Sequence, residues 1–158
     1  MKNLLIIGCG LLGSSLLRRI SKKKLAKKIF VYEKSKLNIA KIKKLKLPGT
    51  IVKSLKEGVV NSDLIILCTP MSEYQKLIIE INSSISPKTL ITDIGSSKVE
   101  SSKIIKKFLT KNINWIGSHP ITGSEVSGPE HGKDNMFEDK WCVLIKDKDK
   151  NLKHLKFL

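Results

Sequence analysis

The residue types best suited to chemistry gather between residues 117 and 128, in the stretch Gly-Ser-His-Pro-Ile-Thr-Gly-Ser-Glu-Val-Ser-Gly. The apolar run Ile113–Ile116 before it predicts a strand, and Pro120 with three glycines predicts an irregular loop after that strand. The loop carries His119, whose imidazole has a pKa suited to proton transfer near neutral pH. A single loop histidine can equally do no more than hydrogen-bond the backbone, but a second motif favours the catalytic interpretation.

The second motif is a glycine turn near the N-terminus. The apolar run Leu4–Ile7 is followed by Gly-Cys-Gly-Leu-Leu-Gly and then by a segment with helical spacing. In a dinucleotide-binding turn the first glycine makes the sharp bend, the second lets the backbone approach the pyrophosphate, and the third lets the helix pack closely on the strand. The start of the helix adds free N–H groups and a positive dipole end. We therefore expect a dinucleotide to be bound by Gly8, Gly10, Leu11, Leu12 and Gly13.

An acidic residue stands where that fingerprint requires one. Glu33 follows the apolar run Ile29–Tyr32 and lies about 20 residues after Gly13. Its carboxylate can accept hydrogen bonds from the ribose hydroxyls of NAD and would repel the 2′-phosphate of NADP. The Lys-Ser-Lys sequence that comes next could hold this phosphate instead. NAD is the expected cofactor, and NADP stays open.

Two further predicted strands end in residues that would face the same crevice. Thr69 and Pro70 follow the run Leu64–Cys68, and Ser96 follows the run Leu90–Thr92 within the stretch Asp-Ile-Gly-Ser-Ser-Lys. In doubly wound sheets the ligand crevice lies just beyond the carboxyl ends of the strands. We expect Thr69 and Pro70 to line the cofactor site and Ser96 to lie near the reacting groups.

Short apolar runs alternate with longer amphipathic segments along the chain, in the rhythm of βαβ units. The pattern predicts an α/β fold of Rossmann type with a doubly wound, mainly parallel sheet. Residues 1–146 form the predicted dinucleotide-binding domain, and residues 147–158 are a basic tail or the start of a further region. The predicted strands are Leu4–Ile7, Ile29–Tyr32, Thr50–Val52, Leu64–Cys68, Leu90–Thr92, Ile113–Ile116 and Trp141–Ile145, and the predicted helices are Leu12–Ile20, Lys36–Leu45, Ser72–Ile81 and Lys98–Leu109.

Length and composition narrow the function classes. The 158 residues suffice for one domain with a substantial core. The formal net charge is +16, but only two of the 30 basic residues are arginines, and specific nucleic-acid recognition favours arginine forks, so no nucleic-acid partner is expected. No apolar run approaches a membrane span or a signal h-region, so we expect no membrane partner and a cytoplasmic location. The three cysteines lack metal-site spacing, so they are predicted to be small buried hydrophobes, with no metal site.

Together these motifs resemble the nucleotide-binding domain of prephenate dehydrogenases over about residues 2–145. The resemblance rests on the glycine turn, on Thr-Pro at 69–70, on residues 93–98, and above all on residues 118–128, with Asn-Met-Phe at 135–137 and Lys-Trp at 140–141 extending it. It implies a small-molecule substrate and NAD(P)-dependent oxidative decarboxylation of prephenate in tyrosine biosynthesis, or of the related arogenate.

The same resemblance implies roles for individual residues. His119 would contact the substrate hydroxyl as hydrogen-bond acceptor or general base, and Ser96 would orient this network. Ser124 and Glu125 match positions on the substrate side. Thr122 departs from the family, which usually has alanine at this position.

The resemblance also implies a helical C-terminal domain that forms a homodimer, closes the site and binds the substrate's carboxylates with cationic side chains. This dimerisation domain is absent from the 158 residues, and the only arginines, Arg18 and Arg19, belong to the helix after the glycine turn. We expect the isolated chain to bind dinucleotide but to turn over prephenate very slowly. Two alternatives stay open: a truncated nucleotide-binding fragment without turnover of its own, and a Rossmann dehydrogenase of another hydroxy acid.

Overall fold

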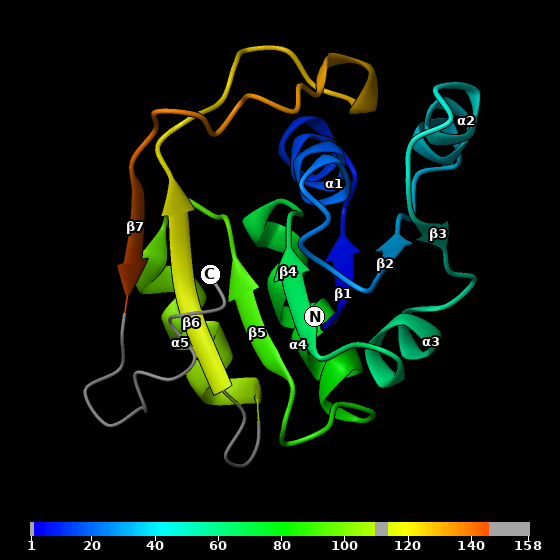
Figure 1. Ribbon diagram of the computed structural model, residues 1–158. Coiled ribbons are helices and arrows are strands. Elements are labelled where there is room, and N and C mark those ends of the chain that lie inside the picture. Colours follow the sequence, from blue (N-terminus) through cyan, green and yellow to red (C-terminus); the bar gives the residue numbers. More distant parts are fainter. Residues whose placement is uncertain (1, 110–113, 146–158) are drawn as a thin grey trace.

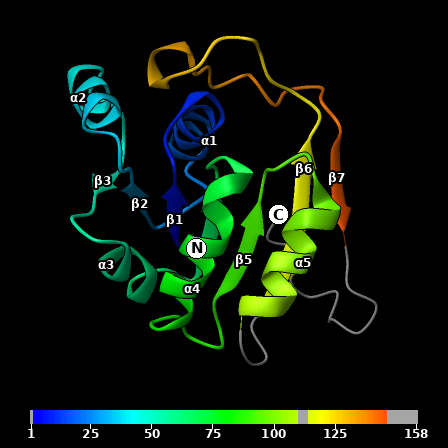
Figure 2. The same cartoon turned by 180° about the vertical axis from the view of Figure 1, so that it is seen from behind.

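The computed structural model describes residues 2–109 and 114–145, which form one seven-stranded sheet with helices on both faces (Figures 1 and 2). The strand order is β3-β2-β1-β4-β5-β6-β7, in which the first six strands run parallel and β7 is antiparallel to β6. The reversal of strand order between β1 and β4 defines a doubly wound sheet, so the predicted Rossmann-type fold is confirmed. The strands are β1 Asn3–Ile7, β2 Lys28–Tyr32, β3 Thr50–Ile51, β4 Leu64–Leu67, β5 Leu90–Asp93, β6 Asn114–Pro120 and β7 Cys142–Ile145, and the helices are α1 Leu11–Lys22, α2 Lys36–Lys44, α3 Leu55–Val60, α4 Tyr74–Asn82 and α5 Lys98–Phe108, with 3₁₀ turns η1 Met71–Glu73 and η2 Pro129–His131.

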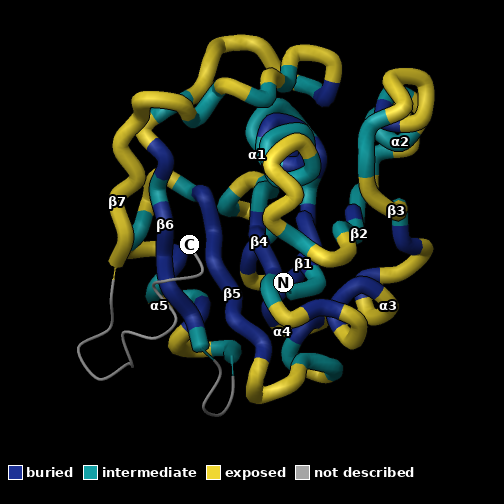
Figure 3. The backbone as a smooth tube through the Cα atoms, in the orientation of Figure 1, coloured by how far each residue is buried: buried dark blue, intermediate teal, exposed yellow. Residues whose placement is uncertain are grey.

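The central strands are mostly apolar because both faces of the sheet are covered. Leu5 and Ile7 of β1 point into a core shared with α3, α4 and α5. Leu4 and Ile6 of the same strand point into a second core with α1 and α2. Figure 3 shows β4, β5 and most of β6 buried in the same way, whereas β7 is exposed along its length.

One helix and one cysteine differ from the sequence-based expectation. The short helix α3 was not predicted, although Ser54 caps it by accepting a hydrogen bond from the N–H of Glu57. Cys142 was expected to be buried but is exposed, because it lies on the edge strand β7. The predicted domain boundary after residue 146 lies outside the described residues. Among the residues described, no helix combines the length and apolar character that crossing a membrane requires.

The largest difference concerns β6, which continues through His119 to Pro120. The expectation that an irregular loop starts at residue 117 was wrong. Strand β7 returns antiparallel and pairs with this part of β6, from Gly117 opposite Ile145 to Pro120 opposite Cys142. His119 is therefore held in a paired strand, which fixes its backbone more firmly than a loop would.

Residues 121–141 leave β6, cross α1 and return to β7 (Figures 1 and 3). We call them the crossing segment. Two hydroxyls of α1 bind its backbone, since Ser14 donates to the carbonyl of Pro129 and Ser15 accepts from the N–H of Lys133. Two ion pairs with α1 add to this attachment, Arg19–Glu138 and Lys22–Asp134, and a third, Lys41–Glu130, joins the segment to α2. The segment is thereby tied to the helix that follows the glycine turn.

Candidate active site

The carboxyl ends of the parallel strands lie along one edge of the sheet, and two adjoining hollows follow this edge. The first, of about 450 Å³, is lined by residues that include Gly8, Glu33 and Lys34, and we call it the Glu33 hollow. The second, of about 520 Å³, is lined by residues that include Gly10, Ser96 and His119, and we call it the His119 hollow. Thr69 and Pro70 line both, so the two hollows form one groove across the switch point between β1 and β4.

The groove brings together most of the residues named from the sequence. The residues that line it are Gly8, Gly10, Leu11, Leu12, Glu33, Thr69, Pro70, Ser96, His119 and Ser124. Gly13 is buried behind the turn, and Glu125 is exposed outside both hollows.

The three glycines of the turn have different surroundings. Gly8 has a φ of +88°, and a Cβ there would lie 2.8 Å from the methyl group of Thr69. A Cβ on Gly13 would lie 2.1 Å from the carbonyl oxygen of Gly8, so only glycine lets α1 pack this closely on β1. A Cβ on Gly10 would meet no atom within 4 Å. The space beside Gly10 is thus open to a ligand, at a helix start that has no capping side chain and no acid in its first turn.

Glu33 is fixed at the end of β2 by two backbone hydrogen bonds. Its Oε2 accepts from the N–H of Cys9 at 2.8 Å, and its Oε1 accepts from the N–H of Ser35 at 2.9 Å. The carboxylate therefore links the glycine turn to the start of α2. Burial and the nearby Glu33 charge raise the pKa of the Cys9 thiol to about 12, so this cysteine stays a neutral thiol.

A buried ion pair supports the turn that carries Ser96. Asp93, fully buried at the end of β5, accepts hydrogen bonds from the ammonium group of Lys98 and from the hydroxyl of Tyr74. A Cβ on Gly95 would lie 3.2 Å from the Asp93 carboxylate, so the turn passes directly over the pair. Burial lowers the pKa of Lys98, although Asp93 opposes this effect. Ser96 was predicted from the sequence of this stretch, whereas the ion pair was not. Its signal in the sequence is an Asp and a Lys five residues apart on either side of the turn.

We expect Lys98→Met to lower the free energy of unfolding by about 3–5 kcal/mol, because Asp93 would stay buried without its cation. The matched control is Lys103→Met on the same helix, where the pair with Glu100 is exposed and the expected loss is below about 1 kcal/mol. Urea denaturation of both variants measures the difference. Equal, small losses would mean that the buried pair does not hold this turn.

His119 projects from the end of β6 into the groove. The neighbouring Ser118 hydroxyl donates to the Asp93 carbonyl oxygen at 2.7 Å, which ties the carboxyl ends of β5 and β6 together. His119 is partly exposed and lines its hollow together with Ser96, although its Nδ1 atom is buried and has no hydrogen-bond partner in the part of the chain that the structure describes. The imidazole thus faces the groove from a rigid support.

The start of the crossing segment forms the outer wall of the His119 hollow. The hydroxyl of Thr122 donates to the carbonyl oxygen of Met136 at 2.9 Å, so it is used within the segment. Ser124 is exposed and lines the hollow. This arrangement leaves Ser124 available to a ligand beside His119.

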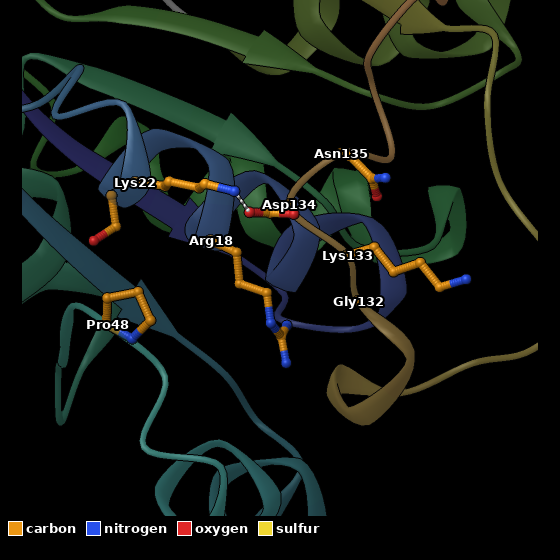
Figure 4. A pocket seen from close by; sticks show the side chains of 8 residues that line it. Arg18, Lys22, Pro48, Gly132, Lys133, Asp134 and Asn135 are labelled. Atoms are coloured by element: carbon orange, nitrogen blue, oxygen red, sulfur yellow. Dashed lines mark hydrogen bonds and ion pairs between the residues drawn. The ribbon is translucent and has the colours of Figure 1, made fainter.

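The two arginines of the chain lie away from His119. Arg18 donates to the carbonyl oxygens of Ser14 and Pro129, and Arg19 pairs with Glu138. Figure 4 shows Arg18 in a separate hollow between α1 and the crossing segment, beside the Lys22–Asp134 ion pair. Both arginines therefore attach the crossing segment to α1 rather than face the groove.

The groove fits a dinucleotide by its own features. It offers the open space beside Gly10, the fixed carboxylate of Glu33, and two buried polar atoms, Thr69 Oγ1 and His119 Nδ1, that have no hydrogen-bond partner among the described residues. A buried polar atom without a partner is unfavourable, so a ligand that satisfies it gains affinity. Within residues 2–109 and 114–145, no cluster of three or more His, Cys, Asp or Glu side chains could hold a metal ion.

Comparisons with known proteins agree on one family. A family model described as the nucleotide-binding domain of prephenate dehydrogenase matches residues 16–158. A cyclohexadienyl dehydrogenase of Zymomonas mobilis is 29% identical over 146 residues, which cover 92% of this chain and 50% of the relative. A prephenate dehydrogenase of Lactococcus lactis is 32% identical over 149 residues, which cover 93% of this chain and 42% of the relative.

A solved structure gives the same picture. The prephenate dehydrogenase of Aquifex aeolicus, in complex with hydroxyphenyl propionate and NAD⁺, aligns with a TM-score of 0.86 and 28% identity over 99% of this chain and 54% of that one. The chain spans about half the length of the curated relatives it matches. The family-model match begins inside α1, so the glycine turn is identified by its geometry rather than by that match.

Proposed function

Since the chain belongs to the prephenate dehydrogenase family, we propose that it is the cofactor-binding part of an NAD-dependent dehydrogenase that oxidises prephenate or arogenate. The observation that carries the proposal is the pair of adjoining hollows, of which one is lined by Gly8 and Glu33 and the other by Gly10, Ser96 and His119. The Aquifex relative, which binds NAD⁺ together with hydroxyphenyl propionate, supports the same pairing of ligands here.

The residues of the groove divide into two sets. Gly10, Leu11 and Leu12 would present backbone N–H groups to the pyrophosphate, and Glu33 would accept hydrogen bonds from the adenosine ribose. Thr69 and Pro70 would line the passage between the hollows. When bound, NAD would supply the hydride acceptor for the reaction.

His119 and Ser96 would act on the substrate. In the reaction, the hydroxyl-bearing ring carbon of the substrate would be oxidised, with bound NAD as the hydride acceptor, and the ring carboxylate would leave as carbon dioxide. The electron pair of the broken bond between the ring and the carboxylate would stay in the ring, which becomes aromatic. The oxygen of the substrate hydroxyl would become the oxygen of a phenol. His119 would accept the hydroxyl proton while the hydride leaves and return it to the phenolate, which requires a neutral imidazole at the start.

Ser96 and Ser124 would hydrogen-bond the substrate beside the imidazole, with Glu125 near the entrance. Neither arginine faces this hollow, so we propose that the groups that bind the substrate's carboxylates come from outside the described residues. Homodimerisation, expected from the family resemblance, is a proposal of the same kind, and light scattering tests it.

The proposal is tested by calorimetric titration with NAD and by assay with prephenate and arogenate in parallel, on the longest natural form of the protein that carries these residues. NAD binding with NADH formed from either substrate supports it. NAD binding without turnover of either would favour the interpretation as a binding fragment, and turnover of a different hydroxy acid alone would reassign the substrate.

We expect the protein to bind NAD at least about tenfold more tightly than NADP, because the fixed carboxylate of Glu33 would lie beside the 2′-phosphate. Titration with each dinucleotide under the same conditions measures the ratio. Glu33→Gln should reduce the preference, since it keeps the shape of the side chain and removes its charge. Equal affinities in the unaltered protein would contradict the assigned role of Glu33.

A further inference from the structure

An ion pair connects two segments at the Glu33 hollow. Lys34 follows Glu33 in the turn after β2, and Glu73 ends η1 in the connection after β4. Lys34 Nζ lies 2.7 Å from Glu73 Oε2, and both residues line the hollow. The side chains are 44% and 42% exposed, so they lie at the opening rather than at the floor. The pair therefore joins segments that are far apart in the sequence.

The Lys34–Glu73 pair affects the net charge of the side chains that line the Glu33 hollow. Four charged side chains line this hollow: Glu33, Lys34, Glu73 and Lys76. Their formal charges cancel. The hydrogen bond with Lys34 lowers the pKa of Glu73, and the same bond raises the pKa of Lys34, so both groups stay charged near neutral pH.

NAD and NADP differ in this hollow by the 2′-phosphate of the adenosine ribose. A phosphate monoester carries a charge of about −1.5 to −2 at neutral pH. Lys34 is the cation directly next to Glu33 in the chain, and it is the natural partner for such a phosphate. While its ammonium group is bound to Glu73, Lys34 attracts a phosphate less strongly than an unpaired lysine would.

We infer that Glu73 is a second determinant of the preference for NAD over NADP, because it engages Lys34 and leaves no net positive charge at the Glu33 hollow. The inference rests on the proposed function in one respect, namely that the groove binds a dinucleotide. Glu33 disfavours the 2′-phosphate by direct repulsion. Glu73 disfavours it by binding the ammonium group of Lys34, the residue next to Glu33 in the chain.

The test is Glu73→Gln, with the affinities for NAD and NADP measured by calorimetric titration at low ionic strength. We expect NADP to bind about fivefold more tightly and NAD to change by less than about twofold, the scale of an exposed charge. The gain should shrink as salt is added, because exposed charges are screened. The matched control is Glu100→Gln, which makes the same change of net charge in the exposed Lys103–Glu100 pair of α5 and should leave the ratio unchanged.

The double variant Lys34→Gln, Glu73→Gln tests whether the effect of Glu73 on NADP affinity depends on Lys34. If Glu73 acts through Lys34, the double variant loses the gain for NADP. An unchanged NADP-to-NAD ratio in Glu73→Gln, or a gain that persists in the double variant, would overturn the inference, while NAD binding by the unaltered protein would still uphold the premise that the groove binds a dinucleotide. Failure of the unaltered protein to bind either dinucleotide would overturn both.

Discussion

Replacing His119 by Asn should reduce turnover by about 10²–10⁴-fold and leave the affinity for NAD within about twofold. Asparagine keeps a hydrogen-bonding side chain but cannot take up a proton at neutral pH. The affinity should survive because His119 does not line the Glu33 hollow, so the contacts expected from Gly8 and Glu33 stay intact. Single-turnover reduction of NAD measures the chemical step, and a separate titration measures binding.

His131→Asn is the matched control, since this exposed histidine ends η2 outside both hollows. It should leave turnover unchanged. Near-normal turnover by His119→Asn would remove the general-base assignment, and an equal loss of NAD affinity would show that the change disturbs the whole groove.

Gly13→Ala should lower the free energy of unfolding by about 2–3 kcal/mol and weaken NAD binding. In an ordinary helix interior the same change is stabilising by roughly 0.5–1 kcal/mol, so the sign of the effect is the result to look for. The new Cβ would lie 2.1 Å from the carbonyl oxygen of Gly8, and this contact is with backbone, which cannot rotate away. The helix start and the turn would have to separate. Urea denaturation and NAD titration measure the two effects.

Gly10→Ala separates folding from binding. A Cβ at this position meets no protein atom within 4 Å, so the loss of stability should stay below about 1 kcal/mol, the scale of a helix N-cap change. The affinity for NAD should fall at least about tenfold, because the methyl group would occupy the space expected for the pyrophosphate. Unchanged affinity would place the phosphates elsewhere.

The sequence predicted the parts of the site that depend on local pattern. The glycine turn, Glu33, Thr69 and Pro70 each follow an apolar run directly, and parallel strands place all their carboxyl ends at the same edge of the sheet. Local pattern sufficed because each residue's place depends only on which strand precedes it.

The features that were missed depend on contacts between distant segments. The paired end of β6 exists because β7 returns beside it, after a crossing segment whose course depends on α1. The Lys34–Glu73 pair joins connections after two different strands. No periodicity within either segment carries that information. Asp93 and Lys98 lie only five residues apart in the sequence. Their pairing was missed because the burial of the pair depends on the packing of Tyr74 and Gly95 around it.

The central claim is that the groove holds NAD beside His119 for oxidation of a prephenate-type substrate. Its most direct test is to follow NADH and carbon dioxide together when NAD and prephenate, or NAD and arogenate, are mixed with the longest natural form of the protein. We predict equimolar NADH and carbon dioxide from at least one substrate, with both products lost in His119→Asn. NADH formed without carbon dioxide, or equal product formation by His119→Asn, would contradict it.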